Sequence, residues 1–253
     1  MKTIVFDTGE TLVRDDRHWA SWADWLGVPR HTVSALVGAA VAQGRDCTDA
    51  LRVLRPGMDV GEAGHARAAA GRGEYLDETD LYPDVRPVLA ELRTLGLRIV
   101  VAGDGTARAG ELLRALDLPA DLVVTSQEWG AAKPDWEFFA RVLEVSGAEP
   151  EATLYVGDHP ANDLFPAKSS GLRAAHIRRG PYGHWWADSW EPRCASCSGR
   201  RSAARPGGGR WTNASISAGT PVRHRSCTRS PRTSRTGTDC PSSGSTWPNC
   251  CTG

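Results

Sequence analysis

Acidic and basic side chains stand beside several apolar runs of the sequence, and together they could form one catalytic site. Asp7 follows the apolar residues 4–6, and Lys133 precedes an expected helix. Asp158 and Asp163 follow a further apolar run. Carboxylates that converge on one place need a cation, and hard oxygen ligands with open positions suit Mg²⁺. With the lysine available to neutralise an anionic group, these residues indicate a magnesium site for an anionic ligand.

The elements that must position these residues are short buried strands separated by amphipathic helices. The apolar runs that predict strands cover residues 4–6, 97–102, 122–124, 153–156 and, more weakly, 173–177. Helical patterns cover residues 84–95, 107–116 and 135–145. This alternation predicts an α/β fold, a doubly wound parallel sheet with helices on both faces. Ligands of such sheets bind beyond the carboxyl ends of the strands.

One segment interrupts the alternation of strands and helices. Residues 14–80 show helical patterns and no convincing strand, with Trp19, Trp22 and Trp25 spaced by three. Apolar stripes of this kind are most often packing faces, not ligand sites. We therefore expect a core formed by residues 1–13 and 81–182, with a small all-helical domain, residues 14–80, inserted after the first strand.

The formal net charge of the 253-residue chain is 0, but its distribution is uneven. Residues 1–190 carry a net charge of −8, and residues 191–253 carry +8. The sequence has no run of 18 apolar residues, which predicts no transmembrane helix, and its first residues lack a signal-peptide pattern. We expect a cytoplasmic protein without a specific nucleic-acid or membrane partner.

Residues 183–253 are expected to form a linker and a disordered, basic tail. From residue 191 onward the chain holds six of the seven cysteines and no Leu, Met, Phe, Tyr or Lys. Such a composition cannot bury enough apolar surface to offset the entropy of ordering. The tail is either a natural basic arm or an out-of-frame translation, and its abrupt start favours the second. Cys194 and Cys197 have a zinc-like spacing but lack a second pair.

Four segments resemble, in order and spacing, the motifs of the haloacid dehalogenase-like (HAD) hydrolase superfamily over about residues 1–182. Residues 6–12 match motif one, and Gly103-Asp104 stands at motif two. Lys133-Pro134-Asp135 matches motif three, and residues 157–163 match the GDxxxxD form of motif four. The helical insert resembles the C1-type cap of the family, which closes over the active site. The whole is similar to actinobacterial HAD hydrolases.

The resemblance implies a Mg²⁺-dependent phosphatase that acts on a small phosphorylated metabolite through an aspartyl-phosphate intermediate. Asp7 would be the nucleophile that attacks phosphorus, and Lys133 would pair with it and with the phosphoryl oxygens. Mg²⁺ would be held by Asp7, Asp158 and the backbone carbonyl of Gly9. Asp163 would be either a direct ligand or one layer further out. The ion would offset the charge that develops during transfer.

The resemblance also implies an anion cradle for the phosphate group. Backbone N–H groups after the nucleophile and at motif two would form it together with the motif-three lysine. The phosphate-binding residues would then be Thr8, Gly9, Gly103, Asp104 and Lys133.

Two positions depart from the family pattern. Phosphatases of the family carry an Asp two residues after the nucleophile, as general acid and base, and this chain has Gly9 there. Losing such a group typically costs about 10²–10⁴-fold in rate, and Glu10 substitutes only if its side chain points into the site. Motif two usually holds Ser or Thr followed by Asn. Here Gly103 and Asp104 replace them, which leaves Thr106 as a candidate hydroxyl.

These departures leave two interpretations open. The chain is either a hydrolase or a catalytically impaired HAD-fold protein that binds Mg²⁺ and phosphate as a binding or regulatory module. Asp7, Lys133 and Asp158 favour the hydrolase, whereas Gly9 and Asp104 favour the second. Chemistry through a cap lysine is disfavoured because residues 14–80 contain no Lys.

Overall fold

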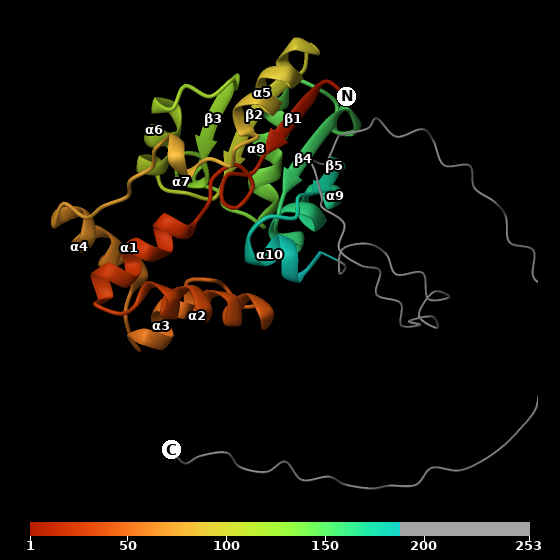
Figure 1. Cartoon of the computed structure of the whole chain (residues 1–253). Helices are drawn as coiled ribbons and strands as arrows, with labels where there is room; N and C mark the ends of the chain where they lie inside the picture. Colours follow the sequence, from red (N-terminus) through yellow and green to blue (C-terminus); the bar gives the residue numbers. More distant parts are fainter. Residues whose placement is uncertain (188–253) are drawn as a thin grey trace, which may run out of the picture. The chain divides into compact units, whose positions relative to one another are not determined.

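A five-stranded parallel sheet forms the centre of the computed structural model, which describes residues 1–187 (Figure 1). The strand order is β3-β2-β1-β4-β5. The strands are β1 (Thr3–Phe6), β2 (Arg98–Gly103), β3 (Leu122–Thr125), β4 (Thr153–Gly157) and β5 (Arg173–His176). The parallel sheet predicted from the apolar runs is therefore confirmed, with the Asp7 strand in the middle.

Each face of the sheet is covered by its own layer of helices, because alternate residues of a strand point to opposite sides. On one face, Ile4 and Phe6 pack with α5 (Val85–Thr94) and α6 (Ala107–Ala115). On the other, Val5 packs with α8 (Trp136–Ser146) and α9 (Phe165–Ser169), and α7 (Ser126–Trp129) lies beside them. This two-sided burial explains why the strands read as continuous apolar runs.

The insert between β1 and β2 contains four α-helices among the described residues. They are α1 (Asp16–Leu26), α2 (Arg30–Ala42), α3 (Asp49–Leu54) and α4 (Val60–Ala69), followed by the short turn η1 (Glu78–Asp80). Trp19 and Trp22 are buried in a separate apolar cluster of this insert, as expected for packing residues, whereas Trp25 is only partly buried. Figure 1 shows these helices, drawn in red and orange, gathered at one end of the sheet.

The chain leaves and re-enters the sheet domain at adjacent points. Val13 forms a single antiparallel bridge with Leu81, and the Arg14 N–H donates to the Asp80 carbonyl at 2.8 Å. This pairing closes the neck of the insert directly beside the carboxyl end of β1. Because of this pairing, the helices of the insert lie next to the edge of the sheet where ligands of parallel sheets bind.

Residues after 182 differ in part from the expected linker. Helix α10 (Gly180–Trp185) runs past that point, and the Trp186 Nε1–H donates to the Val41 carbonyl of α2 at 3.0 Å. The Tyr182 hydroxyl donates to the Arg45 carbonyl at 2.8 Å. These contacts tie the end of the described chain to the insert, because aromatic residues there supply apolar area. The predictions for a disordered tail and its cysteines concern residues outside the described range.

No helix within residues 1–187 is long and apolar enough to cross a membrane.

Candidate active site

Lys133 is the centre of a buried charge cluster at the carboxyl ends of β1 and β4. Its Nζ donates to Asp7 Oδ1 at 2.6 Å and to Asp163 Oδ1 at 2.7 Å. The Lys133 side chain is only 5% exposed. Burial alone would lower the pKa of Lys133, but the charges of Asp163 and Asp7 outweigh it and hold this pKa well above its ordinary value. The lysine is therefore a fixed positive charge beside the expected nucleophile.

Three carboxylates meet at this point. Asp7, Asp158 and Asp163 each offer an oxygen, and these atoms lie within 4.8 Å of one another. Burial raises the pKa of Asp7 to about 6, with Lys133 opposing the shift, and raises the pKa of Asp158 well above its usual range. Within residues 1–187, no hydrogen bond reaches the Asp158 carboxylate. One lysine does not balance three buried acids, so the donor set fits a divalent cation such as Mg²⁺.

Asp163 is held by the loop that follows β4. The turn η3 (Pro160–Leu164) brings its Oδ2 to the His159 N–H at 2.9 Å, while Oδ1 accepts from Lys133. A Cβ on Gly157 would lie only 2.3 Å from Asp163 Oδ2, so this close approach requires glycine. Both oxygens of Asp163 thus have partners, and this fully buried group positions Lys133.

The Thr8 hydroxyl occupies the place that a side chain at the end of β2 would need. A Cβ on Gly103 would lie 2.7 Å from Thr8 Oγ1 and 2.5 Å from Asp7 Oδ1. Glycine is therefore required at this position while Asp7 and Thr8 keep their conformations. Thr8 Oγ1 is buried and has no hydrogen-bond partner among the described residues. This hydroxyl is therefore available to a ligand. It comes from the loop after β1, whereas the resemblance predicts a hydroxyl at the end of β2.

Asp104 lies beside Lys133 and contacts its backbone. Its Oδ1 accepts from the Lys133 N–H at 3.0 Å, and burial raises its pKa. The carboxylate therefore anchors the lysine loop to the end of β2. Thr106, in contrast, is not the substitute hydroxyl that the sequence suggested. Its Oγ1 accepts from the Ala109 N–H at 3.0 Å as the N-cap of α6 and donates to Glu74.

A pocket of about 400 Å³ joins the cluster to the helical insert. Six of the eight predicted site residues line it, and Gly103 and Asp163 do not. The six are Asp7, Thr8, Gly9, Asp104, Lys133 and Asp158. Helices α1 and α4 supply the opposite wall, including Trp19 and Arg67. The predicted nucleophile and its neighbours therefore face a chamber large enough for a small metabolite.

Glu10 and Asp15 also line this pocket. The Glu10 carboxylate already has partners, because it accepts hydrogen bonds from the Tyr82 hydroxyl and from the Asp15 N–H, the latter at 3.2 Å. Asp15 was not predicted as a site residue. Burial, with the nearby acids Glu10 and Asp7, raises its pKa to about 8. The only sequence signal for it is an acid directly before the first helix of the insert.

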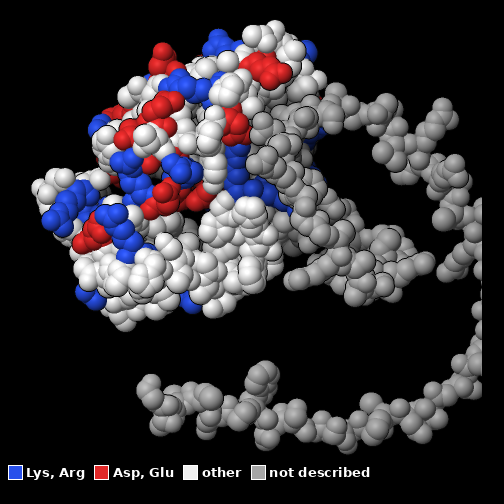
Figure 2. Space-filling view, in the orientation of Figure 1, with Lys and Arg blue, Asp and Glu red and all other residues white. Residues whose placement is uncertain are grey.

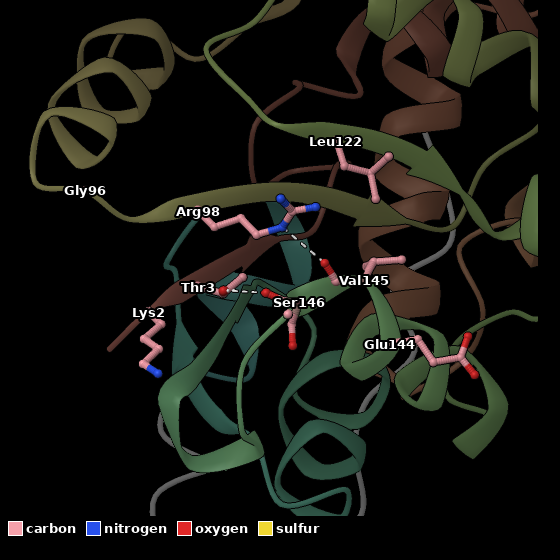
Figure 3. A pocket seen from close by; sticks show the side chains of 9 residues that line it. Lys2, Thr3, Gly96, Arg98, Leu122, Glu144, Val145 and Ser146 are labelled. Atoms are coloured by element: carbon pink, nitrogen blue, oxygen red, sulfur yellow. Dashed lines mark hydrogen bonds between the residues drawn. The ribbon is translucent and has the colours of Figure 1, made fainter.

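A second hollow, of about 540 Å³, lies at the amino ends of the strands (Figure 3). Two of its polar side chains already pair with backbone carbonyls of the same hollow. The Thr3 hydroxyl donates to the Ser146 carbonyl at 2.8 Å, and Arg98 Nε donates to the Val145 carbonyl at 3.1 Å. This hollow holds none of the predicted site residues. The pocket beside Asp7, which holds six of them, is therefore the candidate active site.

Acidic and basic side chains are interspersed over the upper part of the face of the molecule shown in Figure 2, and the lower part of that face is mostly uncharged. On that face, the described residues form no broad area of a single sign.

The strand order and the carboxylate–lysine cluster define a class of protein, a Rossmann-like α/β fold whose candidate site lies beyond the carboxyl end of the central strand. The chain belongs to the haloacid dehalogenase-like hydrolase family, whose model matches residues 1–171. It is similar to a glyceraldehyde 3-phosphate phosphatase of Methanocaldococcus jannaschii, with 39% identity over 104 residues. That match covers 40% of this chain and 46% of the relative, so it spans just under half of the archaeal protein.

Further relatives are similar in sequence, and a solved structure shares the fold. A phosphatase of Mycobacterium tuberculosis is 29% identical over 68% of this chain and 76% of its own length. A phosphoserine phosphatase of Thermus thermophilus is 36% identical over 51% of this chain and 54% of its own length. A haloacid dehalogenase-like hydrolase of Bacteroides fragilis shares the fold, with a TM-score of 0.52 and 21% identity over 70% of this chain and 87% of its own.

Proposed function

We propose that this chain is a Mg²⁺-dependent phosphatase that hydrolyses a small phosphorylated metabolite through an aspartyl-phosphate on Asp7. The observation that carries the proposal is the contact between Lys133 Nζ and Asp7 Oδ1 at 2.6 Å, at the base of a pocket lined by Asp158. A carboxylate held beside a fixed ammonium group is an anionic nucleophile whose orientation is set before the substrate arrives.

In the proposed reaction, a carboxylate oxygen of Asp7 attacks phosphorus, and the leaving group departs on the opposite side. Lys133 offsets the charge on the phosphoryl oxygens. Mg²⁺, held by Asp7, Asp158 and the Gly9 carbonyl, would supply further compensation of that charge. Asp163 would position Lys133 instead of binding the ion directly, because both its oxygens already have partners. Water then hydrolyses the aspartyl-phosphate.

The phosphate group would bind in a cradle at the ends of β1 and β2. The unpaired Thr8 hydroxyl replaces the hydroxyl that the family usually presents from motif two. Backbone N–H groups of the loop at Gly9 and Asp104 complete the cradle together with Lys133. The role of Asp104 is then to fix the lysine loop, which explains an acid at an anion-binding site.

The wall formed by the insert supports a substrate with a second anionic group. Arg67 is 4% exposed and stacks over Trp22 at 4.1 Å, and its Nη2 donates to Ser21 Oγ at 2.6 Å. Its Nε has no partner among the described residues. Burial lowers the pKa of Arg67 and the nearby acid Glu74 opposes this, but within residues 1–187 no carboxylate forms an ion pair with the guanidinium. A buried guanidinium without such a pair is costly unless a ligand supplies one. A substrate carboxylate or second phosphate meets that need.

The phosphatase names of the relatives support the same substrate class, small phosphorylated metabolites. A panel of such compounds, assayed for phosphate release with and without Mg²⁺, tests the proposal. We expect turnover of at least one compound that is lost on chelation of the metal. The alternative, a protein that binds Mg²⁺ and phosphate without turnover, predicts saturable binding and no phosphate release from any compound.

A further inference from the structure

The carboxylate of Asp15 reaches the space that a side chain at position 9 would enter. A Cβ built on Gly9 would lie 3.4 Å from Asp15 Oδ2, 3.5 Å from Oδ1 and 3.8 Å from Cγ. Position 9 is where phosphatases that resemble this chain carry their general acid and base. The glycine therefore leaves a space in front of a carboxylate that comes from a different segment of the chain.

Asp15 does not have the structural role that its position suggests. It precedes helix α1, where an aspartate usually caps the first N–H groups, but its side chain makes no capping hydrogen bond. Asp59, which precedes α4, accepts from the Glu62 N–H at 2.8 Å in the usual way. Within residues 1–187, no cation pairs with the Asp15 carboxylate. The group is directed to the pocket, which it lines together with Asp7 and Gly9.

The backbone of Asp15 is held on both sides. Its N–H donates to Glu10 Oε1 at 3.2 Å, and its carbonyl accepts from the Trp19 N–H at 3.0 Å. Glu10 is itself anchored by the Tyr82 hydroxyl and adopts a left-handed φ of 52°. A non-glycine residue rarely takes this conformation without a compensating contact. These contacts fix the backbone from which the Asp15 carboxylate extends toward position 9, and a group that transfers protons must be positioned in this way.

We propose that Asp15 is the catalytic general acid and base of this enzyme, in place of an aspartate at position 9. The inference rests on the proposed phosphatase function and names a further residue of the same site. The proposal also removes the main reason for interpreting the chain as a catalytically impaired protein. The acid and base that is absent at Gly9 is then supplied by Asp15.

The proton transfers balance over the two half-reactions. In the first, an oxygen of Asp7 bonds to phosphorus while the bond from phosphorus to the leaving oxygen breaks. The carboxyl group of Asp15 gives its proton to that oxygen, so an alcohol leaves. In the second, the Asp15 carboxylate takes a proton from water as the water oxygen bonds to phosphorus. The bond from phosphorus to Asp7 breaks, inorganic phosphate leaves, and both aspartates regain their starting states.

The test compares Asp15→Asn with the matched control Asp16→Asn in the full-length chain. Asp16 is the adjacent acid, its side chain is 72% exposed, and it does not line the pocket. We expect Asp15→Asn to lower kcat about 10²–10⁴-fold on an alkyl phosphate, whose leaving group needs a proton. The loss should be smaller on p-nitrophenyl phosphate, whose leaving group departs without one. Asp16→Asn should keep wild-type turnover on both.

A second variant separates a chemical role from a structural one. Gly9→Asp combined with Asp15→Asn restores an acid at position 9, and it should recover at least part of the lost turnover on the alkyl phosphate. Gly9→Asp alone should give no such gain, because it brings two carboxylates together. We expect Asp15→Asn to retain binding of Mg²⁺ and beryllofluoride, as measured by calorimetry. Retained binding would show that the site still forms in the variant.

Two results would overturn the inference in an active enzyme. Wild-type turnover in Asp15→Asn would do so, as would an equal loss on both substrates without rescue by Gly9→Asp. If Asp15→Asn does not fold, Asp15→Ser takes its place in the same comparison. Absence of turnover by the wild-type chain on every phosphoester would instead reject the proposed phosphatase function, and the Asp15 assignment with it. That outcome is distinct from an active enzyme that tolerates the loss of Asp15.

Discussion

Lys133 Nζ lies 2.6 Å from Asp7 Oδ1, although the two residues are 126 positions apart in the chain. The contact joins the loop before α8 to the end of the central strand. Lys133 Nζ also donates to Asp163 Oδ1 at 2.7 Å, so a single ammonium group bridges two carboxylates. The same contact therefore orients the proposed nucleophile and compensates the buried negative charge. The first role predicts an effect on turnover, and the second predicts an effect on stability.

Asp7→Asn should abolish phosphate release on every substrate that the wild type hydrolyses. An amide has no anionic oxygen, so it cannot form the acyl-phosphate bond. We expect beryllofluoride with Mg²⁺ to bind the wild type and not the variant, as measured by calorimetry. Turnover of the variant equal to that of the wild type would reject Asp7 as the nucleophile.

Lys133→Met should lower both stability and turnover. The change leaves Asp7 and Asp163 buried without their ammonium partner, and breaking a buried pair in this way costs about 3–5 kcal/mol of unfolding free energy. Loss of the charge that faces the phosphoryl oxygens should lower kcat by about 10²–10³-fold. Urea denaturation without metal at pH 8 and steady-state kinetics with Mg²⁺ measure the two effects.

The stability deficit of Lys133→Met should shrink as the pH falls. Without the lysine, burial keeps the folded-state pKa of Asp7 above its unfolded value, so protonation of this acid relieves the folded state. The matched control is Lys2→Met, an exposed lysine far from the cluster, which should stay within about 0.5 kcal/mol of wild type. A deficit that is constant between pH 5 and 8 would contradict the electrostatic cause.

Mg²⁺ should stabilise the folded chain, and the effect should depend on Asp158. Binding at 100 times Kd contributes about 2.7 kcal/mol, which corresponds to a rise in Tm of about 5–10 °C for a domain of this size. Asp158→Asn removes one charged donor and should abolish most of this rise, whereas the exposed-acid control Asp16→Asn should keep it. Thermal unfolding with increasing Mg²⁺ measures the shift. An equal rise in both variants would place the ion elsewhere.

Arg67→Met should change substrate binding more than stability. The methionine keeps apolar contact with Trp22 and removes a buried charge, a replacement that is often neutral for stability. We expect KM to rise about tenfold or more for a phosphoester that carries a carboxylate, since a hydrogen bond to a charged group contributes about 1.5–3 kcal/mol. KM for an uncharged phosphoester should not change, and equal KM effects on both would exclude a second anionic subsite.

Cys47 should react slowly with alkylating reagents in the folded chain. Burial, with the nearby charges of Asp46 and Asp15, raises the pKa of its thiol to about 12. The thiolate is the reactive form, so the rate should increase about tenfold per pH unit between pH 7 and 11. Iodoacetamide labelling followed by peptide mass spectrometry measures the Cys47 peptide alone. Labelling in urea supplies the control, and equal rates in both conditions would contradict the shift.

Local sequence patterns predicted the strands and most of the residues that line the candidate site. An apolar run followed by a polar turn marks the end of a buried strand, and this pattern predicts that Asp7 and Asp158 lie at the same edge of the sheet. Lys133 also followed from its position before a helix. Such predictions succeed because parallel strands of one sheet present all their carboxyl ends together, whatever the details of packing.

Tertiary structure decided which side chains face one another across segments. Asp15 and Gly9 are neighbours because the loop after β1 folds back on itself, with Gly9 bridged to Val13 and the Asp15 N–H donating to Glu10. The Thr8 hydroxyl is available because Gly103 has no side chain to displace it, and Thr106 is unavailable because it caps α6. These relations depend on distances between atoms that packing brings together, and residue spacing along the chain carries no record of them.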